Sequence, residues 1–137
     1  MAKMSQECQD AISNIENIAF STCSKDGIPN VVPVGMKKVI DDETIMVSDQ
    51  FMNKSLANIK ENPHVALSVW DKNGGFQVKG TVAYENEGPK FENAAAGVNE
   101  IFKSIGLDFK SKGICFIHVD AVYSVTPGEN AGALLSE

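Results

Sequence analysis

The stretch Asn30–Ile40, NVVPVGMKKVI, has the β-branched residues of a strand but also contains a proline and a glycine. Proline removes a hydrogen-bond donor and glycine removes a side chain, so both are typical of strand edges, of bulges, or of places where another group approaches the backbone. Pro33 alone is explained equally well by an edge strand protected from aggregation. The stretch therefore indicates either a protected edge strand or a strand along which a ligand lies.

The length and composition are those of one globular domain. The chain has 137 residues, 43% of them hydrophobic and 22% charged, and we expect a single domain over 1–137 with an N-terminal helix in 1–16 and a C-terminal tail in 126–137. The sequence begins without the apolar core of a signal peptide. No apolar run approaches the roughly 20 residues that cross a bilayer. We therefore expect a cytoplasmic protein without a membrane partner.

The charge pattern excludes one class of partner and restricts the chemistry of any anion site. The net charge is −6, which argues against nucleic acid because such binding depends on a basic surface. All twelve basic residues are lysine, and there is no arginine. An anion site must therefore use lysine, hydroxyl groups and backbone amides in place of the bidentate guanidinium.

The three cysteines do not form a metal-binding pattern. Cys8, Cys23 and Cys115 are far apart and lack a CxxC or a His/Cys ligand spacing. We expect reduced core thiols and no metal site.

Six segments have the pattern of strands, and three have the pattern of helices. The expected strands are Ile18–Ser24, Ile28–Ile40, Thr44–Ser48, His64–Trp70, Phe76–Glu85 and Gly113–Val125. The expected helices run from Ser5 to about Glu16, from about Asn53 to Asn62, and from Phe91 to Ile105. Gly27 is expected to take a positive φ in a hairpin turn, and Gly80 to form a bulge. The chain is therefore mainly β, an antiparallel barrel or sandwich with flanking helices.

The start of the second helix is the sharpest chemical signal. Asn53 is a plausible N-cap, and Lys54 and Ser55 fall in the first turn, where Asp or Glu is usual. A lysine there becomes favourable if an anion such as a phosphate binds the free amides. The alternative is a solvated surface lysine with Asp49 as an exposed partner. With VVPVG and MVSDQ nearby, a flat ring could lie along the strands while its phosphate reached the helix, which is the shape of flavin mononucleotide (FMN).

Three runs together resemble the pyridoxamine 5′-phosphate oxidase-like FMN-binding split-barrel family, in its short single-domain form. The runs are IAFSTCSKDGIPNVVPV, IMVSDQFMNKSLANIKENPHVALSVW and GFQVKGTVAYENEGPKFE. The resemblance covers about Ile18 to Val125. It implies a six-stranded antiparallel split β-barrel that forms a homodimer with FMN at the subunit interface.

The resemblance also implies cofactor-binding residues. Val32, Pro33 and Val34 would pass along the ring edge, and Val47, Ser48 and Asp49 would line the ring and the ribityl chain. Asn53, Lys54 and Ser55 match the phosphate-binding helix start. Trp70, Gln77 and Lys79 lie on strands that would approach the flavin from the same or the partner subunit, although Trp70 is better explained as a core or interface aromatic.

One departure from the family restricts the function. The true oxidases use arginines at the flavin phosphate and in a C-terminal segment that holds the substrate phosphate, and this chain has no arginine. Oxidation of pyridoxamine phosphate is therefore not expected. The leading hypothesis is a flavin-dependent oxidoreductase acting on a small substrate, with a reduced nicotinamide as one possible electron donor. The alternatives are a non-enzymatic FMN carrier or electron-transfer protein, a barrel that binds haem or a deazaflavin, and an interaction module without cofactor.

Overall fold

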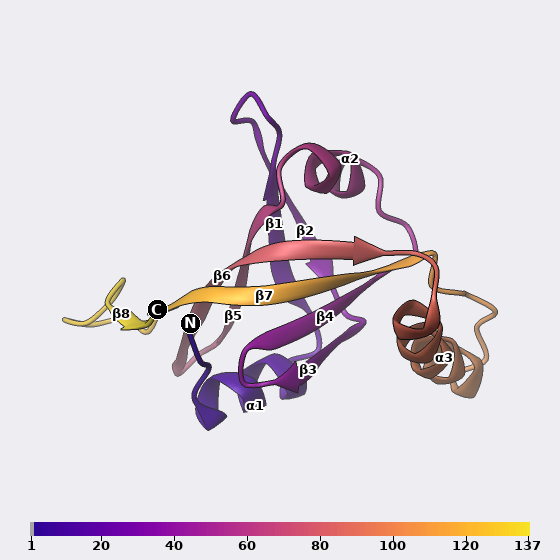
Figure 1. The fold of residues 1–137 in the computed structure, drawn as a ribbon. Helices are drawn as coiled ribbons and strands as arrows, with labels where there is room; N and C mark the ends of the chain where they lie inside the picture. Colours follow the sequence, from indigo (N-terminus) through magenta and orange to yellow (C-terminus); the bar gives the residue numbers. More distant parts are fainter. Residues whose placement is uncertain (1) are drawn as a thin grey trace.

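One curled antiparallel sheet dominates the molecule, with three helices at its margins (Figure 1). The structure is a computed structural model and describes residues 2–137. The sheet order is β2-β1-β5-β6-β7-β4-β3, and β8 pairs with β7. The strands are β1 (Ile18–Cys23), β2 (Pro29–Val34), β3 (Lys37–Asp41), β4 (Thr44–Asp49), β5 (His64–Asp71), β6 (Gly74–Glu85), β7 (Gly113–Ser124) and β8 (Leu134–Ser136). This arrangement confirms the mainly β split-barrel fold.

The strand count differs from the six expected, for two reasons. The segment predicted as one strand over Ile28–Ile40 is divided at Gly35 and Met36 into β2, which pairs with β1, and β3, which pairs with β4. The glycine therefore marks the point where the chain passes from one edge of the sheet to the other. The segment 126–137, predicted as a C-terminal tail, contains β8, which pairs with β7.

The position of β2 explains its proline. β2 is the first strand in the sheet order and pairs only with β1, with Pro33 opposite Ala19. Proline is tolerated there because an edge strand has no neighbour on its outer side. The edge-strand interpretation of Pro33 is therefore confirmed.

Two glycines have the geometry that the sequence predicts. Gly27 has φ of 85° in the turn between β1 and β2. The register of β6 against β7 shifts between Lys79 and Gly80, which is the expected bulge. A Cβ atom on Gly80 would lie 2.5 Å from the His118 carbonyl oxygen, so the close approach of β7 requires a glycine.

Three helices complete the fold: α1 (Gln6–Asn14), α2 (Lys54–Glu61) and α3 (Pro89–Ser104). α1 buries Cys8 and Ile12 in the main core, and α2 buries Ile59 there. α3 places Val98 in a separate apolar cluster with Met46, Ile114 and Phe116. Ile105, where the third helix was expected to end, is the C-cap of α3 and is 64% exposed.

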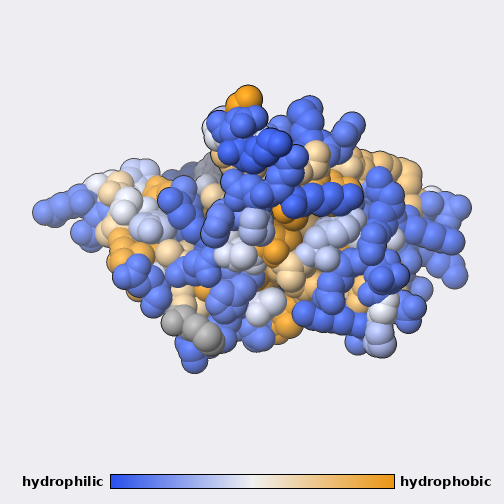
Figure 2. All heavy atoms as spheres, turned by 45° about the horizontal axis from the view of Figure 1, so that its top comes forward, coloured by the Kyte–Doolittle hydropathy of each residue, from blue (hydrophilic) through white to orange (hydrophobic). Residues whose placement is uncertain are grey.

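The two ends of the chain meet at the side of the molecule away from α3 (Figure 1). The Lys3 backbone N–H donates to Ser136 Oγ at 3.0 Å. The face drawn in Figure 2 is mostly hydrophilic, with apolar atoms visible in a central hollow. Within residues 2–137, no helix has both the length and the apolar character to span a membrane.

Candidate functional site

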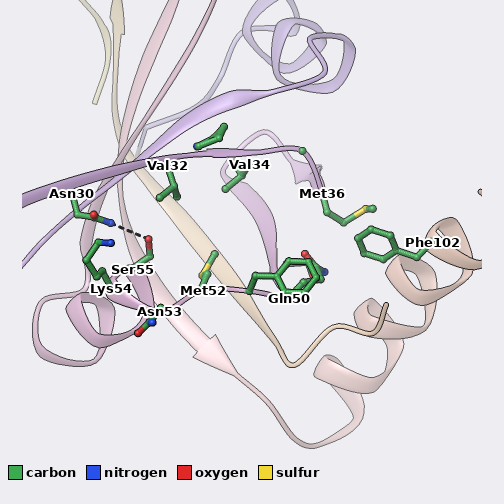
Figure 3. A pocket seen from close by; sticks show the side chains of 14 residues that line it. Asn30, Val32, Val34, Met36, Gln50, Met52, Asn53, Lys54, Ser55 and Phe102 are labelled. Atoms are coloured by element: carbon green, nitrogen blue, oxygen red, sulfur yellow. Dashed lines mark hydrogen bonds between the residues drawn. The ribbon is translucent and has the colours of Figure 1, made fainter. Parts of the chain in front are cut away.

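A cleft of about 500 Å³ opens between β2, the segment that joins β4 to α2, and α3. Figure 3 shows Asn30, Asn53, Lys54 and Ser55 at the α2 end of this cleft, and Met36, Phe102 and the polar Gln50 toward the α3 end. Its lining residues are Asn30, Val32, Pro33, Val34, Gly35, Met36, Ser48, Gln50, Phe51, Met52, Asn53, Lys54, Ser55 and Phe102. The cleft is therefore amphipathic along its length.

Valine side chains of β2 form one wall of the cleft. Val32 lies opposite Phe20 in the β1 register, and Val34 lies opposite Ile18. Phe20 and Ile18 are buried in the main core, so the two valines face the inside of the curled sheet. Both pack against that core and still line the cleft. The strand that the sequence marks as irregular thus borders the cleft along its edge.

The start of α2 forms the polar end. The predicted side-chain cap from Asn53 is absent: Asn53 occupies the N-cap position but makes no capping hydrogen bond. The first turn contains no acidic residue and contains Lys54. Ser55 is 3% exposed, and its Oγ accepts a hydrogen bond from Asn30 Nδ2 at 3.2 Å (Figure 3). Uncapped N–H groups, the helix dipole and a lysine together make this end attractive to an anion.

The interpretation of Asp49 as an exposed partner of Lys54 is wrong. Asp49 is fully buried at the end of β4. Its Oδ1 accepts from the Met52 backbone N–H at 2.9 Å, and its Oδ2 accepts from the Tyr84 hydroxyl at 2.7 Å. Burial, and next the hydrogen bond to Asp49, raise the pKa of Tyr84. Asp49 therefore holds the turn that leads into α2, and its charge does not offset that of Lys54.

Seven of the twelve residues predicted to bind the cofactor line the cleft together. They are Val32, Pro33, Val34, Ser48, Asn53, Lys54 and Ser55. The other five lie elsewhere. Val47 is fully buried in the main core, and Asp49 faces Tyr84.

The remaining three predicted residues lie on the outer face of the sheet. Along β5 the valines at 65 and 69 are buried, so Trp70 projects outward and is 55% exposed. Gln77 and Lys79 alternate with the buried Val78 on β6. The register pairs Gln77 with Ser68, and Lys79 with Ala66. These two side chains therefore lie beside small residues, Ser68 and Ala66, on the same face of the sheet.

The sequence reasoning missed seven lining residues. They are Asn30, Gly35, Met36, Gln50, Phe51, Met52 and Phe102. The period-2 alternation of β2 could have found Asn30, because it lies two residues before Val32 on the same face. No local signal identifies Phe102, which reaches the cleft only because α3 packs beside it.

The cleft carries little acid–base chemistry of its own. Lys54 is the only titratable side chain among its lining residues. No cluster of three His, Cys, Asp or Glu side chains suited to a metal ion occurs in residues 2–137. The lining groups can therefore bind and orient a ligand that brings its own reactivity.

Comparisons with known proteins give one curated relative and many structures of the same fold. The chain is 36% identical to an uncharacterized protein of Methanocaldococcus jannaschii, over 100% of this chain and 91% of that one. The crystal structure of HupZ of Group A Streptococcus has a TM-score of 0.77 at 24% identity, covering 94% of this chain and 99% of that one. An FMN-binding protein of Syntrophomonas wolfei has a TM-score of 0.75 at 19% identity, covering 90% and 87%.

Other solved structures of this fold include an F420 reductase and the haem storage protein HutZ of Vibrio cholerae. The fold is thus shared by proteins with different ligands. The family model for pyridoxamine 5′-phosphate oxidase matches residues 4–124. Because that match spans most of the sequence, the chain belongs to the pyridoxamine 5′-phosphate oxidase family.

Proposed function

We propose that the chain binds FMN in the cleft between β2, α2 and α3, and acts as an FMN-dependent oxidoreductase on a small substrate. The observation that carries this proposal is the uncapped start of α2, with Lys54 and Ser55 at one end of a cleft whose other end is mostly apolar. A ligand with a single anionic end and a planar apolar body complements that arrangement. Family membership makes a flavin the first candidate.

The residues present suit the phosphate of FMN. Arginine is absent, and the α2 start instead offers the Lys54 ammonium, backbone N–H groups and the Ser55 hydroxyl. Asn30 already donates to Ser55 Oγ, which leaves the serine proton free to be donated to a phosphate oxygen. This donor set replaces the guanidinium fork with a point charge and several directed donors.

The residues at the other end suit a ring. Val32, Val34, Met36 and Phe102 are apolar and line the cleft beyond the α2 start (Figure 3). Burying a planar ring against them removes apolar surface from water, worth about 25 cal/mol per Å². The wall formed by β2 adds backbone groups of an edge strand that β1 leaves unpaired on one side.

A homodimer would complete the site. Trp70, Gln77 and Lys79 project from the outer face of β5 and β6, away from the cleft of their own chain. Cross-strand pairs of small residues, Ala19 with Ser68 and Ser21 with Ala66, make part of that face flat. If two chains pack through this face, the three side chains reach the partner's cleft and contact its flavin. We propose that the cytoplasmic form is this dimer.

When bound, FMN supplies hydride and electron transfer, and the chain contributes position and shielding from water. Because Lys54 is the only titratable lining residue and lies at the phosphate end, the cleft offers no general acid or base beside the ring. A reaction that needs only hydride or electron exchange fits this lining. Oxidation of pyridoxamine phosphate fits it less well, because the chain has no arginine to hold the phosphate of that substrate.

The same lack of acid–base groups favours a second candidate, an FMN carrier or electron-transfer protein without a turnover substrate. The two functions differ in one measurement. The purified protein is examined by visible absorption before and after anaerobic addition of NADH or NADPH, then after readmission of oxygen or a small acceptor. Repeated cycles of bleaching and recovery support the oxidoreductase, and a stable flavin spectrum that only a chemical reductant bleaches supports the carrier.

The spectrum also tests the cofactor itself. Flavin bands in stoichiometric amount support FMN, and an intense Soret band would indicate haem instead. A colourless protein that does not bind added FMN would contradict the proposal.

A further inference from the structure

A chain of hydrogen bonds runs from the backbone beside α3 to the wall of the cleft. Ser111 Oγ donates to the Gly113 carbonyl oxygen at 2.9 Å, and Ser48 Oγ donates to Ser111 Oγ at 2.7 Å. Gln50 Nε2 in turn donates to Ser48 Oγ. Ser48 and Ser111 are 5% and 9% exposed, so these are interior hydrogen bonds with little competition from water.

The Gly113 carbonyl oxygen, at the end of this series of hydrogen bonds, fixes the direction in which each of them is donated. A carbonyl oxygen only accepts, and each serine hydroxyl has one proton. Ser111 uses its proton on Gly113, so Ser48 must donate to Ser111 and can only accept from Gln50. The amide of Gln50 must therefore direct its nitrogen toward Ser48. Its Oε1 and second amide proton have no partner within residues 2–137.

The free amide oxygen lies in the part of the cleft where other groups are apolar. Figure 3 shows Gln50 beyond Met52 from Lys54, toward Met36 and Phe102. An acceptor in such surroundings that loses water without a new donor costs about 1–3 kcal/mol. A ligand that fills this half of the cleft must therefore present an N–H or O–H group to Gln50.

We propose that Gln50 Oε1 accepts a hydrogen bond from the ring N–H of the flavin pyrimidine, and that Ser48 and Ser111 are positioning residues for that amide. The inference rests on the proposed function, since it names the contact of the same cleft with the ring end of the cofactor. The pyrimidine edge of a flavin is a cyclic imide, with one N–H between two carbonyl groups. The fixed amide of Gln50 complements it with an acceptor and a remaining donor. Metal-bound haem has no such N–H at its edge.

The test compares FMN with FMN methylated at the imide nitrogen, using flavin fluorescence to measure both dissociation constants. In the wild-type protein the methylated ligand binds about 3–10-fold more weakly, the value of one neutral hydrogen bond. In Gln50→Ala this ratio falls to near one. Gln50→Met keeps the side-chain volume without the acceptor, and it weakens FMN itself by about the same 3–10-fold. An unchanged affinity of Gln50→Met for FMN, or an unchanged ratio in Gln50→Ala, overturns the inference.

The positioning role has its own variant and control. Ser111→Ala frees the Ser48 proton to bond the Gln50 oxygen, so the amide turns and the ratio of the two dissociation constants falls toward one. Ser104→Ala is the matched control, because Ser104 Oγ also donates to a backbone carbonyl, that of Ile101, but has no link to the cleft. A ratio in Ser111→Ala equal to that of the control overturns the positioning role.

The outcomes separate this inference from the function on which it rests. If the wild-type protein does not bind FMN, the proposed function fails, and the contact fails with it. If FMN binds but methylation has no effect on wild-type affinity, only the role of Gln50 fails.

Discussion

The two short helices α1 and α2 begin in opposite ways. At the start of α1, Ser5 Oγ accepts a hydrogen bond from the Cys8 backbone N–H at 3.1 Å, and Glu7 lies in the first turn. At the start of α2, the N-cap side chain makes no capping bond, the first turn has no acid, and Lys54 adds a positive charge. α1 therefore satisfies its own amides and dipole, and α2 leaves both unsatisfied.

The difference is one of surroundings. α1 packs on β3 and the core, away from the cleft, and α2 begins at the cleft wall. A carboxylate does lie close in sequence to the α2 start, but Asp49 is bound to the Met52 amide and the Tyr84 hydroxyl. The carboxylate nearest to the α2 start is therefore already bound by other groups and does not stabilise that helix end. A helix start that is stabilised only by an incoming anion is the simplest account of this contrast.

Removing the lysine is expected to have the largest effect on the contrast. Lys54→Ala weakens FMN binding by about 1.5–3 kcal/mol, the range for a hydrogen bond to a charged group. The free protein keeps its stability or gains slightly, because a positive charge leaves the helix start. Isothermal titration measures the affinity, and urea unfolding measures the stability. Lys60→Ala, in the last turn of the same helix, is the control and leaves FMN binding unchanged.

If Lys54→Ala binds FMN with an unchanged dissociation constant, the assignment of the FMN phosphate to the α2 start is contradicted.

The hydroxyl that holds Asp49 is tested by Tyr84→Phe and by pH. Loss of this hydrogen bond to a carboxylate costs about 1.5 kcal/mol at neutral pH. Since folding raises the pKa of Tyr84 above its ordinary value of 10.0, the protonated hydroxyl is favoured in the folded state. Its contribution is fully present below pH 10 and is lost as the pH rises through the folded pKa. Urea unfolding should show wild-type stability falling toward that of Tyr84→Phe only at strongly alkaline pH.

Tyr123→Phe is the control, because it removes a tyrosine hydroxyl from the neighbouring strand β7 and leaves the bond from Tyr84 to Asp49 in place. If the wild-type protein and Tyr84→Phe have the same free energy of unfolding at neutral pH, the assigned hydrogen bond is contradicted.

Removing the cap of α1 tests the other side of the comparison. Ser5→Ala is expected to lower the free energy of unfolding by about 1 kcal/mol, because the Cys8 N–H loses its acceptor. FMN affinity should not change, since α1 does not line the cleft. A change in FMN affinity as large as that in Lys54→Ala would show that the two helix starts are not independent.

Giving α2 the negative charge that its start lacks should reverse the contrast. Asn53→Asp places a carboxylate at the helix start, where it interacts favourably with the helix dipole and raises the stability of the free protein by about 0.5 kcal/mol. The same charge repels a phosphate, so FMN binds more weakly. Asn53→Ser, a neutral capping residue, separates the two effects in thermal melts and titrations. Tighter FMN binding by Asn53→Asp would contradict an anion site there.

The sequence predicts the fold well where the signals are local. The Gly27 turn, the Gly80 bulge and the helices follow from residues near one another in the chain. The division of one expected strand into β2 and β3 could not be predicted, because it depends on the sheet curling until its two edge strands adjoin. The pairing of β8 likewise depends on tertiary contact with β7.

The residues of the candidate site were likewise predictable only where their signal is local in the sequence. Lys54 and Ser55 were found because an unusual charge at a helix start is visible in the sequence. Asp49 was misplaced because only the fold reveals that Tyr84, from a distant strand, binds it. Gln50 was missed because its significance depends on Ser111, which lies 63 residues from Ser48 in the chain.

The smallest expected effect is competition by inorganic phosphate, which tests the α2 start without any substitution. Phosphate and the FMN phosphate would occupy the same amides, so phosphate at a concentration equal to its own dissociation constant doubles the apparent dissociation constant of FMN, about 0.4 kcal/mol. The effect should vanish in Lys54→Ala and persist in Lys60→Ala. Titrations at constant ionic strength, with chloride replacing phosphate, separate specific competition from screening. If chloride lowers FMN affinity as much as phosphate does, the uncapped start of α2 attracts anions only through its electrostatic field. The difference between α2 and α1 would then reflect charge and not a phosphate site.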